Sequence, residues 1–213
     1  MGRAERFWDG IAEKYAADPV TDEAAYQVKL EASRTYFTRE SSILEFGCGT
    51  GTTALLHAPY VGRYLAVDLS SEMVRIAREK AAAEAVNNVT FLHSSIEDLV
   101  PPEPQYDVIM CHSVLHLLDE PEGAIGKIAG LLKPGGVFIS STFCMKALPF
   151  FLRPLLTLGQ WIGKVPPVSY FSAPELEAAM VEAGLEIVHK SRPGDKRVLF
   201  LVARRPAEPE TGL

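Results

Sequence analysis

The chain has 213 residues, 47% of them hydrophobic and 23% charged, and it carries a net charge of −6. This length and composition predict a single domain with one substantial core. The acidic balance and the lack of a run rich in Lys and Arg argue against a nucleic-acid partner. The three cysteines lack C-x-x-C spacing, so neither a disulfide framework nor a zinc site is favoured. The first residues show no signal-peptide core, and we expect a cytoplasmic protein.

The N-terminal region is predicted to form two amphipathic helices, which make residues 1–40 a helical cover for the rest of the domain. Apolar side chains recur at helical spacing over residues 4–15. Asp18 ends this helix because it precedes Pro19, and the residue before a proline disfavours the α conformation. A second helix is expected over residues 22–37.

A short apolar strand at residues 42–46 leads directly into a glycine-rich turn and a helix start. Gly47, Gly49 and Gly51 stand at alternate positions, giving G-x-G-x-G rather than the dehydrogenase pattern G-x-G-x-x-G. Glycines are needed where the chain turns sharply and where a ligand approaches bare backbone. An ordinary connecting turn is the alternative.

A second buried strand, at residues 64–68, ends in Asp68, which lies 21 residues after Gly47. In a βαβ unit this is about the interval at which an acidic side chain meets a ribose held by the glycine turn. A carboxylate accepts two hydroxyl hydrogen bonds at once, which suits a vicinal diol. The alternative is that Asp68 or Ser70 only caps the helix that begins near Ser71.

The remaining elements alternate between strand and helix, which predicts a parallel sheet and an α/β fold. We expect further strands at 89–92, 106–111, 136–142, 185–190 and 197–203, and helices at 52–57, 71–85, 121–132 and 173–183. The predicted domain spans residues 1–203, and the tail at 204–213, with its Pro and Gly residues, is expected to be disordered.

Two later motifs complete the pattern: Gln105–Cys111 reads as a buried strand, and Leu131–Ile139 contains an L-K-P-G-G turn before another strand. With the glycine turn and Asp68, they resemble the motifs of the class I S-adenosylmethionine (SAM) methyltransferases over roughly residues 42–142. The resemblance implies a Rossmann-like, doubly wound seven-stranded sheet with helices on both faces and the last strand antiparallel. It also implies SAM as the cofactor and S-adenosylhomocysteine as the product.

The resemblance assigns residues to the methionine and ribose portions of the cofactor. These are Glu45, Gly47, Cys48, Gly49, Gly51, Asp68 and Cys111. Asp68 would accept from the ribose hydroxyls, and Cys111 would offer its carbonyl to the methionine amino group. Tyr15 matches a tyrosine that helps to close the pocket, with simple core packing as the alternative.

Around the adenine, the resemblance implies packing by Leu69 and Met73 and a backbone and apolar contact from Ile96. Ser95 stands where the family often has an aspartate that accepts from the adenine amino group. A hydroxyl can also accept, though more weakly than a carboxylate. The adenine site is therefore expected to be less polar than in relatives that carry the aspartate.

The chain has five histidines, which are candidates for catalytic or metal-binding groups. His112 and His116 have the i, i+4 spacing of a metal-binding helix, but the glutamate of H-E-x-x-H and a third ligand are missing, so no metal site is expected. His112 follows the fourth strand and is the candidate general base or polar substrate contact. His116 is interpreted as structural, and His57, His93 and His189 as structural or surface residues.

The most apolar stretch of the chain is residues 143–171, interrupted by Lys146, Arg153 and Lys164. These charges exclude a membrane-spanning helix. One hypothesis is a bent helix that completes the core. The other is a cap insertion over the substrate pocket that also contacts membrane lipid with a basic, apolar face, because ligands bind outside the carboxyl ends of strands in such sheets.

The leading functional hypothesis is an enzyme that methylates a small, largely apolar molecule, resembling the ubiquinone/menaquinone-biosynthesis methyltransferases. N- or S-methylation of a small amine, lipid headgroup or thiol is an alternative, and so is a SAM-binding protein without transferase activity. The Asn-Pro-Pro-aromatic signature of nucleic-acid amino methyltransferases is absent after the fourth strand, where Cys111-His112-Ser113-Val114 stands.

Overall fold

The structure, a computed structural model, describes residues 2–99, 105–161 and 164–207. Within these ranges seven strands form one sheet in the order β3-β2-β1-β4-β5-β7-β6. Pairing is parallel from β3 through β5, whereas β7 is antiparallel to both of its neighbours, β5 and β6. The strands are β1 Ser42–Phe46, β2 Arg63–Asp68, β3 Val89–His93, β4 Tyr106–His112, β5 Leu132–Phe143, β6 Glu186–Ser191 and β7 Val198–Arg204.

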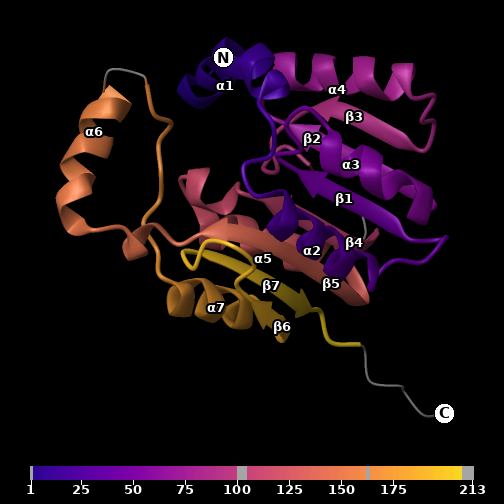
Figure 1. Ribbon diagram of the computed structural model, residues 1–213. Coiled ribbons are helices and arrows are strands. Elements are labelled where there is room, and N and C mark those ends of the chain that lie inside the picture. Colours follow the sequence, from indigo (N-terminus) through magenta and orange to yellow (C-terminus); the bar gives the residue numbers. More distant parts are fainter. Residues whose placement is uncertain (1, 100–104, 162–163, 208–213) are drawn as a thin grey trace.

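Helices cover both faces of the sheet (Figure 1). They are α1 Arg3–Ala17, α2 Glu23–Arg34, α3 Thr52–His57, α4 Ser71–Ala83, α5 Pro121–Leu131, α6 Arg153–Trp161 and α7 Ala173–Glu182. The central strand β1 is buried along its whole length, as expected for a parallel strand covered on both sides. Its side chains alternate, so Ile43 packs with the buried residues of α3 and α4 and Leu44 with those of α5 and α7.

The predicted α/β fold, with its seven strands and antiparallel last strand, is confirmed. β5 begins at Leu132, four residues before the predicted start, because Leu132 pairs with Tyr106 beyond a register shift in β4. The predicted disordered tail began too early. β7 continues through Arg204, and Arg205 donates to the carbonyl oxygens of Ala129 and Leu132; residues 208–213 lie outside the described residues.

The apolar segment 143–171 leaves the sheet at the end of β5 and does not form one bent helix. It contains two 3₁₀ turns, η3 Met145–Ala147 and η4 Phe150–Leu152, followed by α6. Figure 1 shows α6 standing away from the sheet, with the turns η3 and η4 between β5 and α6 and an extended stretch running back toward α7. The segment, called the cap below, joins the core at its two ends through Cys144 and Phe171, whereas α6 is not a layer of the core.

Candidate cofactor and acceptor site

The glycine turn after β1 requires residues without side chains. Gly47, Gly49 and Gly51 have φ angles of 65°, 53° and 78°, in the left-handed region that favours glycine. A Cβ on Gly47 would lie 2.2 Å from Val114 Cγ2, and a Cβ on Gly51 would lie 2.8 Å from side chains of α4 and β3. A Cβ on Gly49 would make only ordinary contact, so Gly49 is restricted mainly by its backbone conformation.

Asp68, at the end of β2, binds the glycine turn directly. Its Oδ2 accepts from the backbone N–H of Gly49 at 2.8 Å, and its Oδ1 accepts from the backbone N–H of Ser70 at 2.8 Å. The helix cap is supplied by Ser70, whose Oγ accepts from the N–H of Met73 at 3.1 Å. Burial raises the pKa of Asp68. Each carboxylate oxygen retains a second lone pair, which leaves Asp68 able to accept two further hydrogen bonds.

A cavity of about 880 Å³ opens where β1, β2 and β4 end. This is the carboxyl edge of the parallel strands, where ligands bind in open α/β sheets. Nine of the predicted site residues line it: Tyr15, Gly47, Gly49, Asp68, Leu69, Met73, Ser95, Ile96 and His112.

Four predicted site residues are absent from the described lining of this cavity: Glu45, Cys48, Gly51 and Cys111. Gly51 packs against α4 and β3 instead, and the Cys48 and Cys111 thiols are buried, which raises their pKa. The Glu45 carboxyl is enclosed in the protein and accepts a 2.8 Å hydrogen bond from the Tyr64 hydroxyl. Burial raises the pKa of Glu45 to about 8.

Ser95 lines the cavity, but its hydroxyl is already engaged. It donates to Asp98 Oδ2 at 2.8 Å and accepts from the Asp98 backbone N–H at 3.2 Å. The loop after β3 therefore places the Asp98 carboxylate one hydrogen bond away from the position where the family often has an aspartate. One lone pair of the Ser95 hydroxyl stays available to an adenine amino group.

Tyr15 projects from α1 over the glycine turn. A Cβ on Gly49 would lie 3.6 Å from Tyr15 Cε1, and the Tyr15 ring is 52% exposed. Burial raises the pKa of its hydroxyl, and the negative charges of Asp68 and Glu45 raise it further. Tyr15 is thus positioned at the cavity rather than in the core, and its edge-to-face partner Trp8, 6.3 Å away between ring centroids, also lines the cavity.

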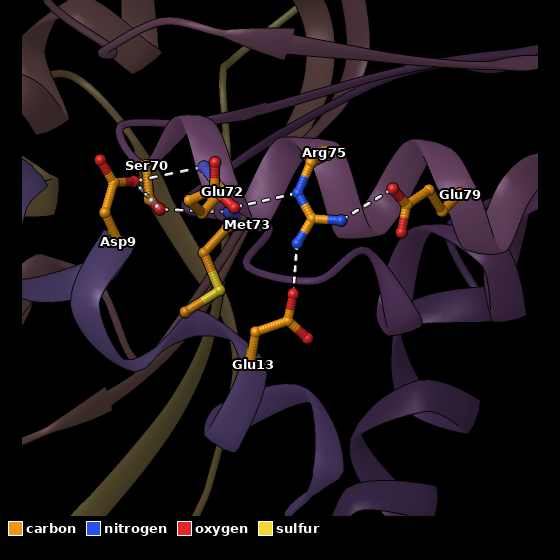
Figure 2. Close-up of polar contacts among 7 residues, drawn as sticks. All are labelled: Asp9, Glu13, Ser70, Glu72, Met73, Arg75 and Glu79. Atoms are coloured by element: carbon orange, nitrogen blue, oxygen red, sulfur yellow. Dashed lines mark hydrogen bonds and ion pairs between the residues drawn. The ribbon is translucent and has the colours of Figure 1, made fainter.

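Helix α1 is fixed to α4 by polar contacts (Figure 2). Asp9 Oδ1 accepts from Ser70 Oγ at 2.6 Å and from the backbone N–H of Glu72 at 3.2 Å. Arg75 of α4 forms an ion pair with Glu13 on α1 and pairs with Glu72 and Glu79 on its own helix. The helix that carries Tyr15 and Trp8 is therefore held at the same N-terminus of α4 that follows Asp68.

His112, the candidate base, ends β4 and lines the cavity. Burial lowers its pKa to about 3, and the positive charge of Lys29 on α2 contributes. At neutral pH the ring is therefore uncharged, and its Nδ1 is buried without a hydrogen-bond partner among the described residues. Such a ring can accept or donate one hydrogen bond to a ligand, but it is a weak base.

The other side of the cavity is apolar and was not assigned residue by residue from the sequence. It is formed by Phe143, Met145, Leu148, Leu156, Val165, Pro166 and Val168. All seven belong to the cap, whose inner surface they make up. Two lining residues could have been predicted from the rule that ligands bind at the carboxyl ends of strands: Phe143, which ends β5, and Ser113, which follows β4. Ser113 has a φ of 61°, in the left-handed region that favours glycine. Trp8 and the extended stretch 165–168 carry no such signal.

These residues fit a SAM molecule. A nearly buried carboxylate with free lone pairs suits the ribose hydroxyls, and apolar Leu69, Met73 and Ile96 lie next to it on the cavity wall. The backbone of Gly47 and Gly49 allows close approach. Within the described ranges, no group of three or more His, Cys, Asp or Glu residues is placed to hold a metal ion.

Comparison with known proteins agrees with this arrangement. The family model described as "Methyltransferase domain" matches residues 43–136. The uncharacterized methyltransferase YcgJ of Bacillus subtilis is 35% identical over 100 residues, which is 47% of this chain and 40% of the relative. The crystal structure of YcgJ superposes with a TM-score of 0.70 at 20% identity, covering 86% of this chain and all of that chain.

Two further relatives carry more specific names. The ubiquinone biosynthesis O-methyltransferase of Xanthomonas campestris is 32% identical over 144 residues, 65% of this chain and 56% of the relative. The malonyl-[acyl-carrier protein] O-methyltransferase of Priestia megaterium is 32% identical over 165 residues, 75% of this chain and 59% of the relative. The chain thus spans about 40 to 60% of the length of these curated relatives. With the motifs and the fold, these matches identify residues 43–136 as a methyltransferase domain of the class I SAM-dependent type.

Proposed function

We propose that this protein transfers a methyl group from SAM to a small, largely apolar acceptor. The observation that carries the proposal is the continuity of the cavity. Gly47, Gly49 and Asp68 line one end, and Leu148, Leu156 and other apolar side chains of the cap line the other. One space can therefore hold a polar cofactor and an apolar acceptor next to each other, which is what a transfer between two bound molecules needs.

At the cofactor end, the chain's own residues bind and orient. Asp68 would accept from both ribose hydroxyls while it keeps its bonds to the Gly49 and Ser70 N–H groups. SAM when bound supplies a methyl group activated on a positively charged sulfur, so transfer is an in-line displacement by the acceptor atom. Tyr15 and Trp8 on α1 would close this end of the cavity and exclude water.

At the acceptor end, Phe143, Met145 and the inner surface of the cap form an apolar wall. Such a wall binds an apolar ring or chain by removing it from water. His112 would orient the acceptor through a hydrogen bond from or to its free Nδ1. We assign it an orienting role, because an imidazole with a pKa of about 3 removes protons poorly at neutral pH.

The low pKa of His112 also favours a second candidate, methylation of a neutral amine or another acceptor that attacks without first losing a proton. An acceptor hydroxyl needs a base unless it is already acidic, whereas a neutral amine does not. The O- and N-acceptor hypotheses therefore differ in the pH dependence that they predict for turnover.

The test combines binding and turnover. Calorimetry with SAM and S-adenosylhomocysteine measures the cofactor site. Release of S-adenosylhomocysteine is then measured with a panel of apolar phenols, amines and thiols over a pH series. Leu156→Gln and Val165→Thr polarise the acceptor wall, and Val28→Thr, at an exposed residue of α2 that does not line the cavity, is the control.

We expect the Leu156 and Val165 variants to lower kcat/KM for the acceptor at unchanged SAM affinity. Failure to bind SAM would contradict the proposed function. SAM binding with no turnover on any acceptor class would instead support a SAM-binding protein without transferase activity.

A further inference from the structure

The outer surface of the cap is the largest group of exposed apolar side chains in the part of the chain that the structure describes. Its members, with their exposed fractions, are Phe150 (80%), Trp161 (79%), Phe151 (66%), Leu155 (66%) and Leu158 (53%). Leu155, Leu158 and Trp161 recur every three residues along α6 and so share one face of the helix. An apolar surface of this kind marks an interaction site.

The backbone of the cap returns onto α6, and this face has no partner among the described residues. The backbone N–H groups of Lys164 and Val165 both donate to the carbonyl oxygen of Gly159, at 2.8 and 3.2 Å. A Cβ on Gly159 would lie only 2.8 Å from Val165 Cγ2, so α6 and the returning chain pack closely. Figure 1 shows α6 on the outside of the molecule, away from the sheet.

The charge of the cap indicates which kind of partner binds its outer face. Residues 143–171 contain Lys146, Arg153 and Lys164 and no Asp or Glu, whereas the rest of the chain carries a net charge of −9. Lys146 is ion-paired with Glu175 at the base of the cap, and Lys164 is exposed near its tip. An isologous pairing of two copies would place two acid-free, basic surfaces against each other. Aromatic and aliphatic side chains with basic residues beside them are typical of helices that lie in the surface of a membrane.

We propose that the outer face of the cap binds the surface of an anionic lipid bilayer. Phe150, Phe151 and Trp161 enter the headgroup region, and the exposed Lys164 contacts lipid phosphates. The proposed contact is with the membrane surface. No helix among the described residues is long and apolar enough to span a bilayer.

This placement also connects the bilayer to the cavity. Leu156 lies on α6 but lines the cavity, as do Val165 and Pro166 of the returning chain. The cap therefore has one apolar surface toward the lipid and one toward the proposed acceptor site. Membrane binding itself requires neither SAM nor an acceptor, so its test is independent of the proposed function.

The first experiment is flotation of the full chain with vesicles. One set contains phosphatidylcholine alone and the other a mixture of phosphatidylcholine and phosphatidylglycerol. We expect binding to the mixed vesicles, weakened by added salt, because charge attraction is screened. Phe151→Ser combined with Trp161→Ser should reduce partitioning by about tenfold or more. The matched control, Val28→Ser combined with Val181→Ser, changes two exposed apolar residues on α2 and α7 and should bind like the wild type.

Two charge-reversal variants test the electrostatic contribution to membrane binding. Lys164→Glu should weaken binding to the mixed vesicles. Arg39→Glu makes the same change of charge at an exposed residue just before β1, at the opposite edge of the sheet, and should not weaken binding. Equal effects of the two changes would show that only net charge matters and would overturn the assignment to the cap.

A spectroscopic measurement decides the case even if a surface variant is poorly folded. The chain has two tryptophans, so Trp8→Phe leaves Trp161 as the only one. Its emission should shift to shorter wavelength when mixed vesicles are added. An unchanged emission, or no flotation with mixed vesicles, overturns the proposal. A further result would also overturn it: light scattering shows that the wild type is a dimer, the Phe151/Trp161 variant is a monomer, and the wild type binds no vesicles. The outer face of the cap would then bind a second copy of the chain.

Discussion

Ser70 Oγ donates a 2.6 Å hydrogen bond to Asp9 Oδ1, and this single contact joins α1 to the residue that also binds Asp68. Ser70 thus has three roles: it caps α4 through the Met73 N–H, holds Asp68 through its own N–H, and holds α1 through its hydroxyl. The helix that carries Tyr15 and Trp8 is therefore fixed close to the Asp68 carboxylate.

The first prediction follows from this contact. Asp9→Ala removes two hydrogen bonds to a carboxylate, one from the Ser70 hydroxyl and one from the Glu72 N–H, and frees α1 at its midpoint. Each such bond contributes about 1.5–3 kcal/mol. We expect SAM affinity to fall severalfold and hydrogen exchange to speed up across α1, with a small fall in Tm. Glu13→Ala is the control on the same helix, because it removes only an exposed ion pair with Arg75 and should have little effect. Equal effects of both changes would contradict a specific role for Asp9.

The second prediction concerns Asp68. Asp68→Asn removes the negative charge and replaces one acceptor oxygen by an NH₂ group, which cannot accept from Gly49, Ser70 or ribose. Calorimetry should show SAM binding at least about tenfold weaker, since each hydrogen bond to a charged group contributes about 1.5–3 kcal/mol. Asp119→Asn, also at the cavity, should bind SAM normally. Normal binding by the Asp68 variant would rule out its role at the ribose.

The third prediction separates the glycines by what an added methyl group meets. Gly47→Ala combines a left-handed backbone cost of about 1–2 kcal/mol with an overlap against Val114 that costs about 1–3 kcal/mol. Gly49→Ala carries only the backbone cost, so it should lose less stability but still lose SAM affinity. Gly130→Ala in α5 meets open space and should gain about 0.5–1 kcal/mol. Denaturant titrations and calorimetry on the three variants measure both quantities.

The sequence predicted the strands and the glycine turn well because their signals are local. Apolar runs identify buried parallel strands, and left-handed positions require glycine. The sequence did not predict which of the three glycines line the cavity. The G-x-G-x-G pattern is the same whether a ligand fills the space next to Gly51 or, as observed, side chains of α4 and β3 fill it. That difference depends on packing between elements far apart in the chain.

The cap was less predictable than the sheet. Its apolar residues have no uniform period, and Pro149 and Pro154 interrupt any continuous helix, so composition alone allowed either a core helix or an exposed insertion. Which side of α6 faces the cavity depends on the close packing of Gly159 on Val165, a contact that no local pattern encodes. The engagement of Ser95 by Asp98 is similar: the residues were visible in the sequence, but their hydrogen bonds depend on the turn after β3.

That turn changes the expected outcome of a substitution at Ser95. The family resemblance alone predicts that an aspartate at this position leaves SAM binding equal or tighter, because a carboxylate accepts a stronger hydrogen bond than a hydroxyl. In the structure, Ser95→Asp would place a second carboxylate beside Asp98, and two like charges at hydrogen-bond distance repel. We therefore predict weaker SAM binding for Ser95→Asp, with recovery in the double variant Ser95→Asp, Asp98→Asn. Calorimetry on both variants checks this, and equal or tighter binding by the single variant would contradict it.

The last prediction uses the buried carboxyl of Glu45, whose pKa is raised to about 8 from an ordinary 4.5 by burial. A raised pKa means that the folded protein binds more protons than the unfolded chain between these two values. The free energy of unfolding contributed by Glu45 is therefore greatest below pH 4.5 and decreases as the pH rises toward 8, by up to about 1.4 kcal/mol per pH unit.

Glu45→Gln cannot ionise, yet its side-chain oxygen can still accept from the Tyr64 hydroxyl. The difference in Tm between this variant and the wild type should be near zero or negative at pH 4.5 and should grow in favour of the variant up to pH 8, then level off. Other titrating groups cancel in the difference, so thermal melts of the two proteins across this range isolate Glu45. A difference that stays constant with pH would show that Glu45 is not held as a neutral carboxyl. Weaker SAM binding by the variant would then indicate that its charge acts on the cofactor even though it does not line the cavity.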